Sequence, residues 1–113
     1  MHEYSIIQAL MARVESEARK HRAVSVHRIE LRIGEQSGVE TDLLKTAFET
    51  FRYGSICSQA EMAIELVPAA WRCPACDRTF VAGDVLLCPD CRLPARLVAG
   101  DEIFLDRIEM EAA

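Results

Sequence analysis

Two Cys-x-x-Cys pairs constrain this chain more than any other feature of its sequence. Cys73-Pro-Ala-Cys76 is followed by eleven residues and then by Cys88-Pro-Asp-Cys91. Each pair can form a short turn, and two such turns can bring four thiolates onto one tetrahedral zinc ion at about 2.3 Å. Four thiolates leave no open coordination position, so we expect the zinc to be structural rather than catalytic. The spacing therefore predicts a zinc-ribbon-like module with four cysteine ligands.

Other chemistries use the same ligands and stay open at this point. A rubredoxin-like iron binds similar paired turns, and a single CxxC can serve as a dithiol redox centre. The redox motif normally opens a helix after a strand, and neither pair here does so. Zinc is our prediction for Cys73, Cys76, Cys88 and Cys91, with a redox protein or a zinc-ribbon interaction module as the alternatives.

Length and composition describe the rest of the chain. Its 113 residues, half of them apolar, suffice for one modest hydrophobic core and a small second module. No apolar run approaches the roughly 20 residues of a membrane span, and paired CxxC motifs in a reducing compartment indicate metal binding. The fifth cysteine, Cys57, makes complete disulfide pairing impossible. We expect a cytoplasmic protein without a membrane partner.

The charge and the side-chain pattern exclude two classes of function. A net charge of −5 disfavours nucleic acid as a partner. The sequence contains no phosphate-binding loop, no nucleophile with a histidine base and no carboxylate pair that spacing alone brings together. We therefore expect a protein that is not an enzyme and has no catalytic residues.

Hydrophobic periodicity predicts an α+β fold. One helix is expected at residues 5–20. A second helix, capped by Thr41 or Asp42, is expected to stop by Gly54. Alternation predicts one strand that ends at Gly34, and further strands at 61–67 and 102–109. The last two strands flank the cysteines, so we expect them to form an antiparallel pair with the module inserted at its tip.

The same periodicity predicts which side chains form the core. On the first helix the expected core residues are Ile7, Leu10, Met11, Val14 and Ala18, and on the second they are Leu43, Leu44, Ala47, Phe48 and Phe51. In the cysteine module, Trp71 and Phe80 are expected to cover the metal site with apolar surface.

The N-terminus offers a second kind of metal site. The amine of Met1, the deprotonated amide of His2 and the His2 imidazole can form fused chelate rings around one ion. Nitrogen donors in a square-planar set suit Ni²⁺ or Cu²⁺. His21 and His27 lie near a helix end and a strand start, where solvated or capping roles are expected.

Several segments, in order and over essentially the whole chain, resemble the HypA/HybF family of hydrogenase-maturation nickel chaperones. They are Met1-His2-Glu3, the glycine-containing segment 33–39, the Ala47-Phe48-Glu49 helix, the paired CxxC and the closing strand from Gly100. The sequence departs from the family at Arg92-Leu93, where a small Gly-Ser type pair is common.

The resemblance implies a fold and a function. It implies a nickel-binding domain of two helices on a three-stranded antiparallel or mixed sheet, interrupted by the zinc module. We assign residues 1–69 and 97–113 to the nickel-binding domain and residues 70–96 to the zinc module. His2 then matches the nickel-binding histidine, with Met1 and Glu3 as additional donors, and the four cysteines match the zinc ligands.

The resemblance also implies partners. Transient Ni²⁺ would be delivered to the large subunit of a [NiFe] hydrogenase, and the family's usual partner is the GTPase HypB. A homodimer is a further candidate assembly.

Overall fold

The computed structural model describes residues 2–112, with His2 described by its backbone only. These residues form two compact units, and each is described here by itself. The α+β unit comprises residues 2–31, 39–65 and 104–112, and the cysteine unit comprises residues 32–38 and 66–103. None of the helices within residues 2–112 is long and apolar enough to cross a membrane.

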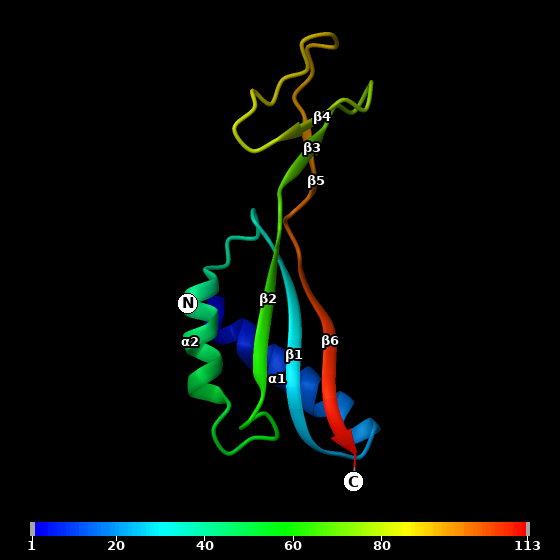
Figure 1. Cartoon of the computed structure of the whole chain (residues 1–113). Coiled ribbons are helices and arrows are strands. Elements are labelled where there is room, and N and C mark those ends of the chain that lie inside the picture. Colours follow the sequence, from blue (N-terminus) through cyan, green and yellow to red (C-terminus); the bar gives the residue numbers. More distant parts are fainter. Residues whose placement is uncertain (1, 113) are drawn as a thin grey trace. The chain divides into compact units, whose positions relative to one another are not determined.

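The described residues contain the following helices and strands, labelled in Figure 1. The helices are α1 (His2–Lys20) and α2 (Thr41–Phe51). The long strands are β1 (Ala23–Gly34), β2 (Glu61–Val67) and β6 (Ile103–Ala112). The short strands are β3 (Ala70–Arg72), β4 (Thr79–Val81) and β5 (Arg96–Ala99).

The long strands form one sheet in the order β2-β1-β6, and α1 crosses one of its faces (Figure 1). Strands β1 and β2 run in the same direction and β6 runs opposite to them, so the sheet is mixed. Ile29, Leu31 and Ile33 of the central strand are buried, whereas Glu30 and Arg32 between them are only partly buried. The alternation places the apolar face of β1 in the core. The expected class, two helices on a three-stranded sheet, is confirmed.

The helices bury most of the positions that their periodicity predicts. Ile7, Met11 and Val14 of α1 are buried, but Leu10 is only partly so. On α2, the buried residues are Leu44, Ala47 and Phe48. Phe51 is partly buried, while Leu43 is 49% exposed and lies outside the core. The prediction for Leu43 was wrong because Leu43 lies about 100° around the helix from Leu44, outside the buried stripe.

The start of α2 also differs from the prediction. The N-cap residue is Glu40 in extended conformation, without a side-chain cap hydrogen bond, so neither Thr41 nor Asp42 caps the helix. Instead, the backbone amide of Glu40 donates a hydrogen bond to Glu3 Oε2, at 3.2 Å. A residue on α1 thus holds the chain at the entry to α2.

The expected antiparallel pair of the second and last long strands does not form, because β1 lies between them. The chain passes from β1 through α2 to the parallel strand β2, and such a crossover places consecutive parallel strands side by side. The remaining edge of β1 is then taken by β6, which extends to Ala112 rather than ending at Glu109.

In the cysteine unit, the short strands form a second antiparallel sheet in the order β4-β3-β5. The hairpin of this unit joins β3 to β4 through the first CxxC turn, with Arg72 opposite Thr79. The segment between the two CxxC pairs, which the structure describes throughout, forms no second hairpin: after β4 the amide of Asp84 donates to the carbonyl of Val81 at 3.1 Å, which closes a turn.

Two glycines of the cysteine unit lie where backbones touch. The amide of Gln36 donates a hydrogen bond to the carbonyl oxygen of Gly100 at 2.6 Å, and a Cβ atom at Gly34 would overlap that carbonyl group. Gly100 has a φ of 89°, which side chains rarely tolerate. Glycine is required at both positions for this close approach.

Candidate metal centres

The structure brings the four cysteines of the paired motif together. Their sulfur atoms all lie within 4.8 Å of one another, and Cys76 Sγ and Cys88 Sγ are 3.7 Å apart. Sulfur atoms bound to one tetrahedral ion at about 2.3 Å are about 3.8 Å apart, so the spacing fits zinc. Cys73 and Cys88 are fully buried, Cys91 is partly buried and Cys76 is exposed.

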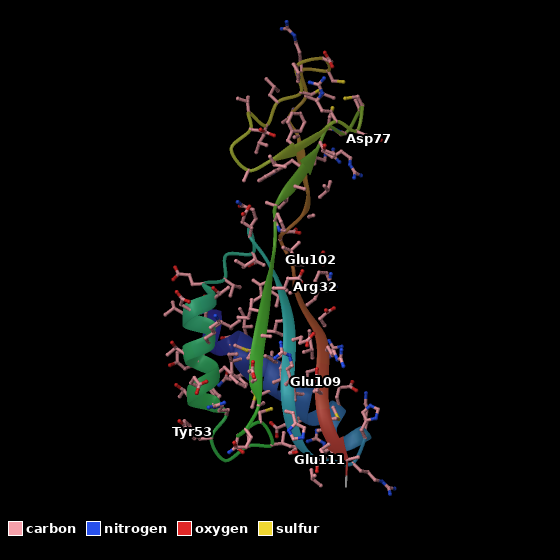
Figure 2. All side chains as sticks on the ribbon, in the orientation of Figure 1. Arg32, Tyr53, Asp77, Glu102, Glu109 and Glu111 are labelled. Carbon is pink, nitrogen blue, oxygen red and sulfur yellow. The ribbon has the colours of Figure 1, made fainter. Side chains whose placement is uncertain are left out.

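The first CxxC turn is closed by two backbone hydrogen bonds. The amide of Cys73 donates to the carbonyl of Arg78 at 2.9 Å, and the amide of Asp77 donates to the carbonyl of Cys73 at 3.1 Å. Asp77, labelled in Figure 2, has a left-handed φ of 63° directly after the second cysteine. This conformation reverses the chain so that both sulfurs point to one centre.

The second turn repeats the first. Here the amide of Cys88 donates to the carbonyl of Leu93 at 2.9 Å, and the amide of Arg92 donates to the carbonyl of Cys88 at 2.8 Å. Arg92 takes the left-handed position with a φ of 56°. The departure from the family pattern at Arg92 therefore leaves the turn intact, with a non-glycine residue in a conformation that glycine prefers.

The proton affinities of the thiols show why this cluster suits a dication. Hydrogen bonds from the amides of Cys76 and Ala75 lower the pKa of Cys73 to about 7. The neighbouring thiols, Cys76 foremost, raise the pKa of Cys91 to about 12. Four sulfurs so close cannot all ionise without a compensating positive charge, which a bound divalent metal supplies.

Apolar side chains cover the cluster as the sequence predicts. Phe80 is buried together with Cys73 and Cys88, and Trp71 packs against these three residues. Leu86 and Ala95 complete the cover. The prediction that Trp71 and Phe80 shield this module is confirmed.

At the other candidate site, Met1 and the side chain of His2 lie outside the residues that the structure describes. The backbone of His2 begins α1, and Glu3 follows in the first turn. The Glu3 side chain is only 5% exposed, and hydrogen bonds from its own amide and that of Glu40 lower its carboxyl pKa. The carboxylate is thus held within the α+β unit by backbone donors.

The next residue also ties the start of α1 to α2. The Tyr4 and Phe51 rings meet edge to face, with centroids 5.7 Å apart. The sequence does not predict the contacts of Glu3 and Tyr4, because the partners Glu40 and Phe51 are far away along the chain. No local pattern in the sequence indicates either contact.

The remaining candidate side chains have ordinary surroundings. His27 Nε2 lies 3.0 Å from Glu111 Oε1 at the surface, and His21 lies 4.0 Å from Glu17 one helical turn away. Cys57 is fully buried, and burial raises its pKa to about 11. Cys57 is therefore a protonated, buried thiol of the hydrophobic core.

Comparisons with known proteins agree with this arrangement. A family model described as "Hydrogenase/urease nickel incorporation, metallochaperone, hypA" matches residues 1–110. The hydrogenase maturation factor HypA of Wolinella succinogenes is 41% identical over 115 aligned residues, which cover 99% of this chain and 97% of the relative. The HypA of Shewanella oneidensis is 40% identical, with 100% and 98% covered.

Solved structures give the same answer for the fold. A solution structure of HypA protein matches with a TM-score of 0.79 at 32% identity, covering 100% of this chain and 98% of that one. The solution structure of the Ni metallochaperone HypA from Helicobacter pylori matches with a TM-score of 0.73 at 31% identity, covering 98% of each chain. With a matching family model over nearly its whole length, this chain belongs to the HypA family of nickel metallochaperones of hydrogenase maturation, which are not enzymes.

Proposed function

We propose that this chain binds Ni²⁺ at its N-terminus and delivers it to the large subunit of a [NiFe] hydrogenase, while Cys73, Cys76, Cys88 and Cys91 hold a structural zinc ion. In this proposal His2 is the principal nickel ligand, through its imidazole and its backbone amide. The family description, nickel incorporation into hydrogenase or urease, supports nickel as the cargo.

The observation that carries the terminal site is the position of His2 at the start of α1. The first amides of a helix have no carbonyl partner within the helix. Deprotonating the His2 amide to bind a metal therefore breaks no helical hydrogen bond. The amine of Met1 completes a nitrogen set that suits square-planar Ni²⁺.

Glu3 is the other candidate donor beside Met1. Its carboxylate already accepts a hydrogen bond from Glu40 at 3.2 Å and is almost fully buried. We therefore favour the backbone of Glu3 over its carboxylate as a donor. The carboxylate would then fix the position of the α1 start relative to α2.

The two sites have opposite chemistry, which fits a protein that must keep one metal and release another. The cysteine cluster is closed by four sulfurs and half buried. A terminal chelate of nitrogen donors is opened by protonation, because its ligands must be deprotonated to bind. The cysteine site would thus stabilise the fold while the terminal site exchanges its cargo.

We further propose residues 1–69 and 97–113 as the nickel-binding domain and residues 70–96 as the zinc module. The partners would be a HypB-type GTPase and the hydrogenase large subunit, in the cytoplasm. Relatives named as hydrogenase maturation factors support the choice of hydrogenase.

The test is a calorimetric titration of Ni²⁺ into zinc-loaded protein that retains its native Met1. A His2→Ala variant and a form with one extra residue before Met1 are titrated alongside. We expect both altered forms to lose nickel binding and to keep their zinc. Unchanged binding in both forms would place nickel elsewhere and would remove His2 from the proposal.

A further inference from the structure

Two arginines face each other across neighbouring strands of the cysteine unit. Arg72 on β3 is paired in register with Arg96 on β5 and, on its other side, with Thr79 on β4. Side chains directly opposite in an antiparallel sheet lie on the same face, with Cβ atoms about 4.5–5.5 Å apart. The three side chains, all exposed, form what we call the arginine row: Thr79, Arg72 and Arg96.

The arginine row is electrostatically uncompensated. Within the part of the chain that the structure describes, neither Arg72 nor Arg96 has an ion-pair or hydrogen-bond partner for its guanidinium group. By contrast, Arg78 in the same unit lies 3.1 Å from Asp90. Like charges directly opposite each other destabilise a sheet, so folding alone does not favour this pairing.

The charge of the four-cysteine site does not explain the row. The next register positions, Phe80 and Trp71, belong to the apolar group that packs with the buried cysteines. Successive side chains of a strand point to opposite faces, so Arg72 lies on the face turned away from that group. The guanidinium groups are therefore presented outward.

We propose that the arginine row is a docking site for an acidic segment of a partner protein. Two guanidinium groups side by side can each bind a carboxylate through paired hydrogen bonds. Val81, two residues after Thr79 on β4, is 59% exposed and lies on the same face. The face thus offers an apolar contact beside two cationic ones, which fits a segment in which acidic and apolar side chains alternate.

Charge favours a polypeptide over a nucleic acid as the occupant. The chain carries a net charge of −5, which opposes binding of a long polyanion such as a phosphate backbone more than binding of a short segment with few charges. A short acidic segment needs only the two arginines. The arginine row contains no residue of the proposed nickel chelate, so this proposal is tested independently of the terminal metal site.

The probe is a fluorescently labelled synthetic peptide of alternating glutamate and valine, titrated into zinc-loaded full-length protein and followed by anisotropy. We expect saturable binding that salt weakens, and each of Arg72→Gln and Arg96→Gln to weaken it roughly threefold to fivefold. Arg19→Gln removes the same charge from the exposed end of α1 and should leave the affinity unchanged. Zinc content is measured for every variant.

Four results would overturn the proposal. They are the absence of saturable binding, an equal loss in Arg19→Gln, unchanged affinity in zinc-loaded Arg72→Gln and Arg96→Gln, and tighter binding of a single-stranded oligonucleotide than of the peptide. Inorganic phosphate as a competitor separates simple anion binding from peptide recognition. If phosphate displaces the peptide when both are present at equal concentration, the row is a small-anion site and the proposal is wrong.

Discussion

The α+β unit and the cysteine unit are stabilised in different ways. Large hydrocarbon side chains fill the α+β unit, among them Phe48, Ile7 and Ile29, which are at most 2% exposed. Between Ala70 and Ala99 the only buried residues are Cys73, Phe80 and Cys88. The cysteine unit also leaves Val81, at 59%, exposed. The α+β unit has an ordinary hydrocarbon core, whereas the centre of the cysteine unit is built largely from sulfur. In our proposal the cysteine unit therefore depends on a bound metal.

The difference teaches how a chain of 113 residues can contain two units. Small units rarely bury enough apolar surface to be stable, and a structural metal supplies the missing free energy. The difference between the units also suggests that holding a structural metal and carrying a transported metal are separate tasks. A metal that holds a unit together must not leave, so a transported metal needs another site with weaker, exchangeable ligands.

The largest predicted effect comes from breaking the cysteine cluster. Cys73→Ala or Cys88→Ala should abolish zinc binding and unfold the module, because structural zinc contributes about 10–16 kcal/mol of apparent binding free energy. Zinc analysis and amide NMR spectra check this, with signals of residues 70–96 lost and those of α1 and α2 retained. Cys57→Ala is the control that should keep its zinc. Unchanged zinc content and melting in the first two variants would refute the dependence on metal.

A core truncation in the α+β unit should have the reverse pattern. Phe48→Ala removes a fully buried ring and should lower the free energy of unfolding by about 3–5 kcal/mol. Urea denaturation followed by helical circular dichroism measures the loss, and a chromophoric chelator reports zinc release. We expect helix loss at lower urea while the zinc stays bound. Simultaneous loss of zinc and helix would show that the two units unfold as one.

Alkaline pH should destabilise the α+β unit through Cys57. Burial raises the pKa of this thiol from its ordinary value of 9.0 to about 11. The unfolded chain therefore loses the proton first, so the contribution to stability is complete below about pH 9 and is lost as the pH rises toward 11, by on the order of 2 kcal/mol. Urea midpoints at pH 8 and pH 10.5 should differ less in Cys57→Ala than in the unaltered chain. An equal difference between the two midpoints in both proteins would contradict the assignment of this pH effect to Cys57.

The smallest predicted effect concerns the second zinc turn. Arg92 has a φ of 56°, which costs a residue with a Cβ atom about 1 kcal/mol relative to glycine. Arg92→Gly should therefore slow zinc release to a competing chelator by a few fold at most. Asp77→Gly offers the matched change in the first turn, where φ is 63°. Faster release from both variants would mean that their side chains, rather than their backbones, support the turns.

The sequence predicted the long helices and the cysteine cluster well, because each has a strong local signal. The periodicity of Ile7, Met11 and Val14 predicts the buried face of α1. The spacing of Cys73 and Cys76 predicts the turn that they form. The three-residue strand β3 was missed because it is too short to show alternation. Its pairing with β4 and β5 is set by the turns that the cysteines form.

Long-range choices were beyond the sequence for another reason. The position of β1 between β2 and β6 follows from the crossover through α2. The alternation of apolar and polar residues along each strand would be the same for any order of the strands in the sheet, so it does not predict that order. Likewise, nothing local indicates that Glu3 accepts a hydrogen bond from Glu40. Such contacts depend on the packing of whole elements.

The most direct test of the two-site account is X-ray absorption spectroscopy, at the zinc and the nickel edges, of the native chain loaded with one equivalent of each metal. We predict zinc surrounded by four sulfurs at about 2.3 Å and nickel surrounded by nitrogen and oxygen only, in a planar site. Sulfur at nickel, or fewer than four sulfurs at zinc, would contradict the separation of a structural metal from a cargo metal.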